Sequence, residues 1–360
     1  MSDRDFQVGV YVDAHPAIAE QARAIERAGF DHVWVYDSPL VFSDPYMALL
    51  DVARATDRVL IGPGVTQPHA RPAHATAQAL GTLAKVAPGR VAFGIGIGNS
   101  ASWSVGQRPA TLDEMHEHIR IVQGMLRGET VDHDVGGGRR APLRFIHPDG
   151  RWIDLSRPVP TWVSAFGPVG QRRAGANADV VLIRWEGAER VAEAKARLAE
   201  GARAAGRPGG GADIGIGTVY CVYPIDDEAE LETAEARAAL GPMVVSRLRY
   251  LTANHEHADE VPEHFRPGFV AYQEHRASLD PVERHLDNYR GYLVHTPPDL
   301  ESFVTPETMR TVATIGSPDE IVAELLEMRD AGVDHVTLQL AGPPAGWCAR
   351  MGERVLPRLR

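Results

Sequence analysis

The sequence predicts an α/β fold, either a barrel or a doubly wound parallel sheet. The first observation is a set of short, nearly continuous apolar runs at 8–12, 33–35, 59–61, 91–95, 161–164, 180–183, 214–222 and 336–340. Strands that are apolar on both faces are typical of a buried parallel sheet. The second observation is that amphipathic segments separate these runs, as the crossover helices of such a sheet must.

A repeated junction joins a helix to the next strand. Residues 28–33 read AGFDHV, residues 331–336 read AGVDHV, and a looser copy, AGANADV, covers 174–180. In each copy an amphipathic run comes before a glycine, and a short β-branched run comes after it. We expect each glycine to end its helix with a positive φ.

Two helix starts carry capping residues. Ser317 is followed three residues later by Glu320, and Thr111 by Glu114. This spacing is typical of a capping box, in which the two side chains satisfy backbone N–H groups of the first turn. The second of these helices should end at Gly128.

Two stretches interrupt the alternation of strands and helices within 1–360, which we otherwise expect to form one domain. Residues 131–160 are rich in Gly, Arg and Pro, and an HPDG turn there predicts a small hairpin that joins 144–146 to 152–153. Residues from about 226 to 306 form a longer insertion with helical patches. We expect this insertion to be a lid over the mouth of a barrel or an oligomer surface.

Composition excludes several classes of protein. The chain has 360 residues and a formal charge of −11, which argues against a nucleic-acid binder. The apolar and charged fractions, 44% and 24%, are those of a soluble globular protein, and no apolar run has the length of a membrane span or signal peptide. Cys221 and Cys348 are too few for a disulfide framework and favour the reducing cytosol. We therefore expect a cytoplasmic protein without nucleic-acid or membrane partners.

Glycine-rich strand ends are the first candidate site. Residues 91–100 end in GIGIGNS, and glycines there let the backbone approach a planar or phosphorylated ligand. A dinucleotide fingerprint is disfavoured, because the third glycine comes too early and the next clear helix begins only at Thr111. The alternative is that these glycines only allow the strand to bend at a corner of a barrel. Residues 60–68, LIGPGVTQP, fit a ligand site or a simple strand exit equally well.

Two further strand ends add polar groups. At 163–172, a Gly167-Pro168 turn opens a helix whose free N–H groups could attract phosphate, and Arg172 or Arg173 could add charge. An ordinary turn would look similar. Asp37 directly follows the second strand. It could form a hydrogen bond with a ligand or take part in a proton relay. Capping of the next segment is an equally good explanation.

The fifteen histidines do not predict a metal site. His116 and His118 face different sides of a helix, and His255 and His257 lack a third ligand nearby. His69, near the exit of the third strand, is better placed for proton transfer, although a structural histidine is the commoner case.

These segments together resemble the luciferase-like monooxygenase superfamily, and within it the F420-dependent branch similar to methylenetetrahydromethanopterin reductases. The matching pieces cover nearly the whole chain outside the insertion: 28–37, 44–46, 61–68 with Arg71, 89–100, 165–168, 316–320 and 331–336. The resemblance implies a (β/α)₈ TIM barrel with insertions and a cis bond between Gly64 and Val65. Gln67 stands where relatives often have Asn, and Pro72 where they often have His. No His-Trp pair follows Asp37, which disfavours sugar phosphates and alcohols as substrates.

The resemblance also implies a cofactor, F420 or alternatively FMN, at the C-terminal ends of the strands. The catalytic residues that we expect are Asp37 and Asn99, which match the family's ring-binding segments, and His69, from its place near the exit of the third strand. The implied cofactor-binding residues are Ser38, Gly64, Val65, Thr66, Ile97, Gly98, Asn99, Ser100, Ala165, Phe166, Gly167 and Pro168. Asp37, Thr66 and Asn99 would bind the ring, and Ala165, Gly167 and Pro168 the phosphate.

The activity this implies is hydride transfer between reduced deazaflavin and a small organic substrate, by a homodimer. One alternative is an FMN-dependent monooxygenase that takes reduced flavin from a partner reductase and activates oxygen. Another is a flavin-binding protein without turnover.

Overall fold

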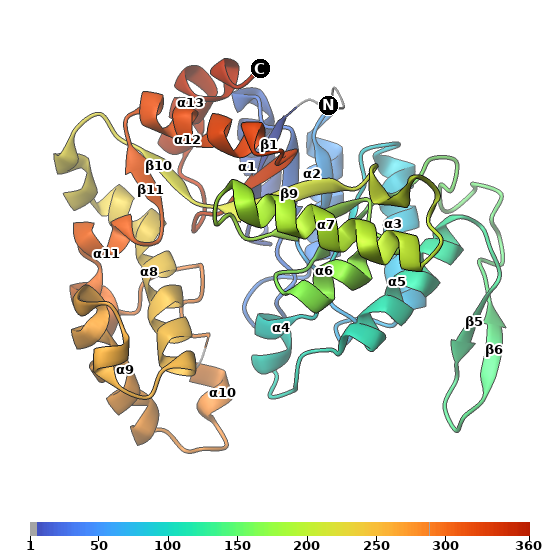
Figure 1. Ribbon diagram of the computed structural model, residues 1–360, viewed down its shortest axis with the longest axis horizontal. Coiled ribbons are helices and arrows are strands. Elements are labelled where there is room, and N and C mark those ends of the chain that lie inside the picture. Colours follow the sequence, from blue (N-terminus) through green and yellow to red (C-terminus); the bar gives the residue numbers. More distant parts are fainter. Residues whose placement is uncertain (1–5, 288) are drawn as a thin grey trace.

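The computed structural model describes residues 6–287 and 289–360 and has eight parallel strands at its centre (Figure 1). Their order around the sheet is β3-β2-β1-β12-β9-β8-β7-β4. Every predicted apolar run contributes one of these strands, and the run at 214–222 continues past β9 into β10 (Val222–Pro224). The strands are β1 (Gln7–Val12), β2 (His32–Val35), β3 (Leu60–Pro63), β4 (Phe93–Ile95), β7 (Thr161–Ser164), β8 (Val180–Ile183), β9 (Gly215–Tyr220) and β12 (His335–Leu338).

Backbone hydrogen bonds between the two ends of this sheet close it into a barrel. The N–H of Ala92 donates to the carbonyl of Ile61 at 2.9 Å, and the N–H of Gly96 to that of Thr66 at 2.9 Å. Glycine is needed where the two strands approach, because a Cβ on Gly94 would lie 2.2 Å from the carbonyl oxygen of Pro63. Of the two folds that the strand pattern left open, the barrel is therefore the correct one.

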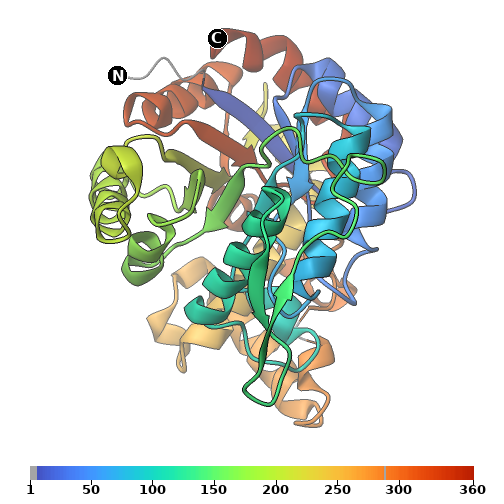
Figure 2. The same ribbon diagram turned by 90° about the vertical axis from the view of Figure 1, so that its right-hand side faces the viewer.

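Helices surround the barrel on the outside (Figure 2). They are α1 (Ile18–Ala28), α2 (Pro45–Ala55), α3 (Ala73–Val86), α5 (Leu112–Leu126), α6 (Pro168–Ala174), α7 (Ala188–Ala204), α12 (Pro318–Asp330) and α13 (Ala345–Arg354). The short helix α4 (Asn99–Trp103) lies instead at the C-terminal ends of the strands. Both predicted capping boxes are present, at α5 and α12. The expectation of no helix before Thr111 is wrong, because α4 starts directly after Gly98. This helix has only five residues, too few to show apolar periodicity.

Two of the three junction glycines have the predicted conformation. Gly29 has φ 98° and Gly332 has φ 89°. Gly175 has φ −52°, so the prediction is wrong there. Helix packing requires a glycine at this position instead, since a Cβ on Gly175 would lie 2.2 Å from the carbonyl oxygen of Leu198 in α7.

The first interruption contains a hairpin, although not the predicted one. β5 (Val131–Asp134) pairs with β6 (Arg140–Leu143) in antiparallel fashion. The turn between them holds three successive glycines, 136–138, all with positive φ. The predicted strands at 144–146 and 152–153 do not form, because these glycines reverse the chain earlier than the HPDG turn does.

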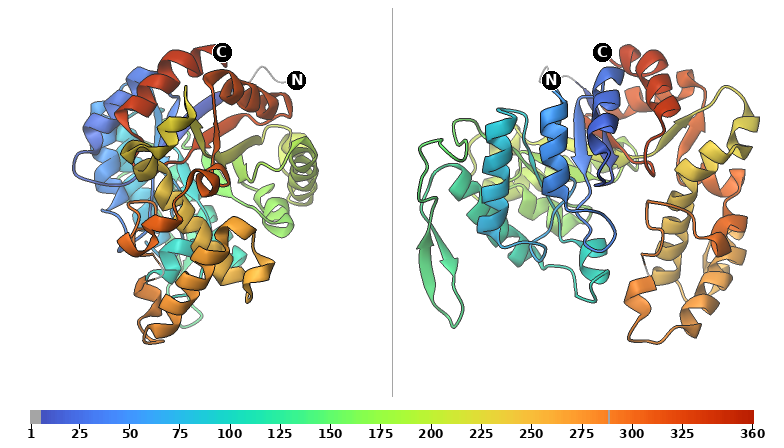
Figure 3. Two further views of the ribbon diagram at one scale, coloured as in Figure 1. Left: turned by 90° about the vertical axis from the view of Figure 1, so that its left-hand side faces the viewer. Right: turned by 180° about the vertical axis from the view of Figure 1, so that it is seen from behind.

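The second interruption forms a helical lobe beside the C-terminal end of the barrel (Figure 3). Its helices are α8 (Ala234–Asn254), α9 (Arg266–Ser278) and α10 (Arg284–Asp287), followed by α11 (Pro306–Arg310). The lobe leaves and rejoins the barrel through a parallel pair, β10 and β11 (Thr314–Gly316). None of the helices in the described part of the chain is long and apolar enough to cross a membrane.

Candidate functional site

A cavity of about 680 Å³ opens at the C-terminal ends of the strands. All eight barrel strands, or the loops that directly follow them, contribute to its wall, and barrels of this kind carry their active sites at this end. The volume lies in the range of small-molecule and cofactor sites. The lining residues are Tyr11, Tyr36, Asp37, Ser38, Gly64, Val65, Gly96, Ile97, Gly98, Asn99, Ser100, Ala101, Leu112, Ser164, Ala165, Phe166, Gly167, Pro168, Val169, Gly170, Arg184, Val219, Tyr292 and Gln339.

Most of the residues singled out from the sequence meet in this one cavity. Those that line it are Asp37, Ser38, Gly64, Val65, Ile97, Gly98, Asn99, Ser100, Ala165, Phe166, Gly167 and Pro168. The peptide bond between Gly64 and Val65 is cis, as the resemblance implies. The roles of these residues stay predictions, but their convergence from four separate loops agrees with a shared ligand.

Asp37 is a buried carboxylate at the edge of the cavity, with 6% of its surface exposed. Its Oδ2 accepts a hydrogen bond from Thr66 Oγ1 at 2.5 Å. Burial raises the pKa of Asp37, while the Thr66 hydrogen bond and the charge of Arg71 oppose the rise. Asp37 does not cap the following helix, because the side chain of Asp44 accepts the N-terminal N–H groups of α2.

Thr66 is fully buried and is not among the cavity's lining residues. Its hydroxyl donates to Asp37, so its side chain supports that carboxylate at the edge of the cavity. The direct ring contact expected of Thr66 is therefore corrected to an indirect one.

His69 lies outside the cavity. Its Nε2 is 3.7 Å from Glu114 Oε2, and its backbone N–H donates to Gln67 Oε1 at 2.7 Å. The ring thus faces the start of α5 rather than the barrel mouth. The geometry does not support the expectation that His69 delivers a proton.

The arginines expected to add charge beside Gly167 face away from the cavity. Arg172 pairs with Glu200 at 2.8 Å, and Arg173 with Asp113 at 2.5 Å. Neither lines the cavity. That prediction is wrong, because both side chains are satisfied by carboxylates of neighbouring helices.

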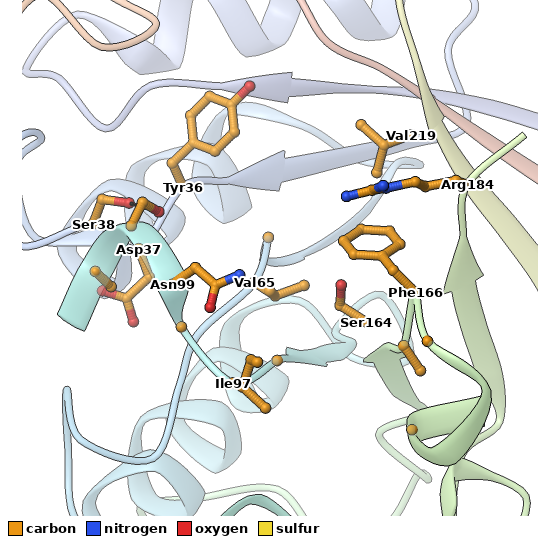
Figure 4. A pocket seen from close by; sticks show the side chains of 18 of the residues that line it. Tyr36, Asp37, Ser38, Val65, Ile97, Asn99, Ser164, Phe166, Arg184 and Val219 are labelled. Carbon is orange, nitrogen blue, oxygen red and sulfur yellow. Dashed lines mark hydrogen bonds between the residues drawn. The ribbon is translucent and has the colours of Figure 1, made fainter. Parts of the chain in front are cut away.

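The sequence analysis missed the side chains that point into the barrel from the strand ends. They include Tyr36, Ser164, Arg184 and Val219, which surround the cavity in Figure 4. A signal was available, because alternate residues of a strand face the same side, so positions two apart along each strand share the interior.

Tyr36 is held rigidly in this group. Its ring stacks on Tyr11 with centroids 5.1 Å apart and on Phe42 at 5.2 Å. Its hydroxyl accepts a hydrogen bond from Gln339 Nε2 at 2.9 Å. Burial holds the pKa of Tyr36 well above its usual value, so the phenol keeps its proton and can donate it in a hydrogen bond.

The inserted lobe also reaches the cavity, through Tyr292. The Tyr292 ring meets Tyr289 edge to face at 5.1 Å, and the guanidinium of Arg249 lies 5.1 Å from its centroid. These contacts hold the ring within the lobe, and the ring also packs against the aromatic cluster of the barrel that contains Tyr11 and Tyr36. A movement of the lobe would therefore change access to the cavity.

Aromatic side chains fill the barrel beneath the cavity. The rings of Trp34 and Trp162 lie 4.7 Å apart, and Trp34 Nε1 donates to His32 Nδ1 at 2.8 Å. His32 occupies the space above Gly9, where a Cβ would come within 1.8 Å of Nδ1. This packed layer gives the cavity a rigid floor.

Glycines form part of one wall of the cavity. A Cβ on Gly64 would lie 2.5 Å from both Tyr11 and Trp34, and a Cβ on Gly98 would lie 2.4 Å from Gln67. The packing of the barrel therefore requires these two glycines, while a Cβ on Gly167, another lining residue, would meet no atom within 4 Å. The described residues hold no group of three or more His, Cys, Asp or Glu side chains that could bind a metal ion.

Comparison with known proteins places these features among related enzymes. Residues 5–335 match the family described as luciferase-like monooxygenase. The 5,10-methylenetetrahydromethanopterin reductase of Methanolobus tindarius is 27% identical over 335 residues, 91% of this chain and 90% of that protein. The F420-dependent glucose-6-phosphate dehydrogenase of Beutenbergia cavernae is 27% identical over 358 residues, 93% of this chain and 90% of that protein.

A solved structure has the same architecture. The coenzyme F420 dependent tetrahydromethanopterin reductase from Methanopyrus kandleri superposes with a TM-score of 0.67. The match covers 99% of this chain and 100% of that chain at 21% identity, and it shows that the fold is shared.

Proposed function

Because the chain belongs to the luciferase-like monooxygenase family, we propose that it is an F420-dependent oxidoreductase that transfers a hydride between the reduced deazaflavin and a small organic substrate. The observation that carries this proposal is the convergence of Asp37, the Gly64-Val65 segment, Asn99 and Gly167 on one cavity. Relatives that span most of the chain and are named as F420-dependent add to it.

We propose that the ring of the cofactor lies in this cavity, whose volume of about 680 Å³ is in the range of cofactor sites. Gly64, Gly96 and Gly98 form part of its wall. Asp37 and Asn99 supply polar atoms at one side, and the 165–168 loop lies at the other. We propose that the first group binds the ring and the loop binds the phosphate.

The protein's own part in such a reaction is orientation and exclusion of water. When bound, F420 supplies the two-electron chemistry. The Tyr36 phenol, fixed by Gln339, is positioned to donate a hydrogen bond to a substrate oxygen or nitrogen. The Tyr292 ring, carried by the inserted lobe, would cover the cavity as a lid.

An FMN-dependent monooxygenase is the second candidate, because the matching family is named for monooxygenases. This version would take reduced flavin from a partner reductase. With either cofactor we propose that the protein is a homodimer in the cytosol. Its two cysteines, Cys221 and Cys348, are free thiols and are buried.

Titration of the purified protein with F420 and with FMN, followed by assays of substrate loss with and without oxygen, tests the proposal. We expect saturable F420 binding and oxygen-independent turnover. FMN preference with oxygen-dependent turnover would instead favour the monooxygenase. Binding without any turnover would indicate a flavin carrier, and binding of neither cofactor would refute both enzyme proposals.

A further inference from the structure

Arg184 is the one positively charged residue among those that line the cavity in the described chain. It directly follows β8, and its guanidinium carbon lies 5.2 Å from the centroid of the Phe166 ring. Figure 4 shows this side chain across the cavity from Asp37. The cavity thus has a carboxylate at one side and a cation at the other.

The residues that the structure describes offer Arg184 no ion pair. The nearby acid in sequence, Glu186, pairs with Arg190 at 3.4 Å. Arg172, which follows the 165–168 loop in sequence, does have an ion pair, with Glu200. Arg184 therefore lines the cavity wall without a carboxylate partner among the described residues.

Stacking on Phe166 prepares the guanidinium for binding. Contact with an aromatic face holds the plane of an arginine while leaving its N–H groups free. Those N–H groups form a fork that matches two oxygens of a phosphate or carboxylate. Phe166 precedes Gly167, and a Cβ on Gly167 would have no atom within 4 Å. Open space therefore lies next to the Phe166 ring that contacts the guanidinium of Arg184.

We propose that Arg184 binds an anionic group, a phosphate or a carboxylate, of a molecule that occupies the cavity. The anion belongs either to the cofactor or to the substrate. The cofactor case rests on the function proposed above. In both cases the cation orients the ligand, with its anionic end toward β8 and its uncharged part toward Asp37.

Ligand pairs that differ only in phosphate test the cofactor case. FMN is compared with riboflavin, and F420 with its phosphate-free deazariboflavin core, by fluorescence titration. If the cofactor supplies the anion, Arg184→Gln weakens binding of the phosphate-bearing member by about tenfold to a hundredfold and leaves the other unchanged. Arg184→Lys recovers part of the loss, because the charge stays and the fork is lost. Arg172→Gln, the matched control, changes neither.

Small anions test the substrate case. Inorganic phosphate and succinate are titrated separately into the cofactor-loaded protein, with cofactor fluorescence as the readout. A saturable response in the wild type that Arg184→Gln abolishes, with cofactor affinity unchanged, assigns the anion to the substrate.

The proposal is overturned if Arg184→Gln behaves like the wild type both with the ligand pairs and with the small anions. It is also overturned if Arg172→Gln has the same effects as Arg184→Gln. Circular dichroism confirms that each variant is folded. If the wild type binds none of the flavins, the proposed function fails separately. Calorimetric titration of the ligand-free protein with inorganic phosphate then tests Arg184 alone, and equal binding by wild type and Arg184→Gln overturns the proposal.

Discussion

Replacement of Gly167 by valine should abolish tight ligand binding without harming the fold. Gly167 has φ −102° and ψ 158°, a β conformation that valine prefers. Nothing lies within 4 Å of the position that its Cβ would occupy, and the residue lines the cavity. The new side chain therefore projects into open space beside the cavity, where we expect the ligand to lie.

The size of the effect follows from these contacts. Without a clash or a strained φ, the free energy of unfolding should change by no more than about 0.5 kcal/mol. A hydrogen bond to a charged group contributes about 1.5–3 kcal/mol, so loss of one phosphate contact weakens binding by roughly tenfold to a hundredfold. Steric exclusion adds to this, so the loss of one contact sets the minimum effect.

Thermal unfolding and fluorescence titration with F420 measure the two quantities separately. Gly175→Ala is the opposing control, because its Cβ would lie 2.2 Å from the Leu198 carbonyl, far from the cavity lining. That variant should lose stability and keep its affinity for F420. An unchanged dissociation constant for folded Gly167→Val would refute the assignment of this loop to the ligand.

Three other substitutions probe the edge, the lid and the floor of the cavity. Because burial raises the pKa of Asp37 above its ordinary 3.8, the folded protein binds more protons than the unfolded chain just above that pH, and stability falls as pH rises through the window. Asp37→Asn should flatten this decline in melting temperature and weaken F420 binding; an identical pH profile would count against it. Tyr292→Ala should speed F420 dissociation roughly tenfold in stopped-flow experiments, whereas Tyr292→Phe should not; equal rates in all three proteins would exclude a lid. Gly9→Ala should destabilise the protein by about 1–3 kcal/mol in urea unfolding, because its Cβ would overlap His32, and wild-type stability would contradict the packed floor.

Local patterns in the sequence predicted the strands and the capped helices, because apolar runs and capping residues act over a few neighbours. Gly175 shows where such patterns fail. A glycine required for positive φ and a glycine required for close helix packing look the same in sequence, and only the contact with α7 distinguishes them. The misplaced hairpin has a similar cause, since two turn signals, HPDG and the glycines at 136–138, competed within one stretch.

The candidate site was predicted where it consists of loops and missed where it consists of barrel interior. Asp37 and Gly167 stand at recognisable strand ends. Arg184 also stands at a strand end, but the sequence analysis assigned the positive charge to Arg172 or Arg173. Their ion pairs with Glu200 and Asp113 depend on tertiary contacts that the sequence does not show. Tyr292 lies in a lobe without any recognisable motif, and its place in the cavity depends on how that lobe folds back.

A crystal structure of the protein soaked with F420 tests the central claim most directly. The account predicts electron density for the ring against the Gly64-Val65 segment, with Asp37 and Asn99 at one edge and the phosphate beside Gly167. Density for F420 elsewhere, such as in the cavity of about 570 Å³ between Leu40 and the inserted lobe, would contradict it.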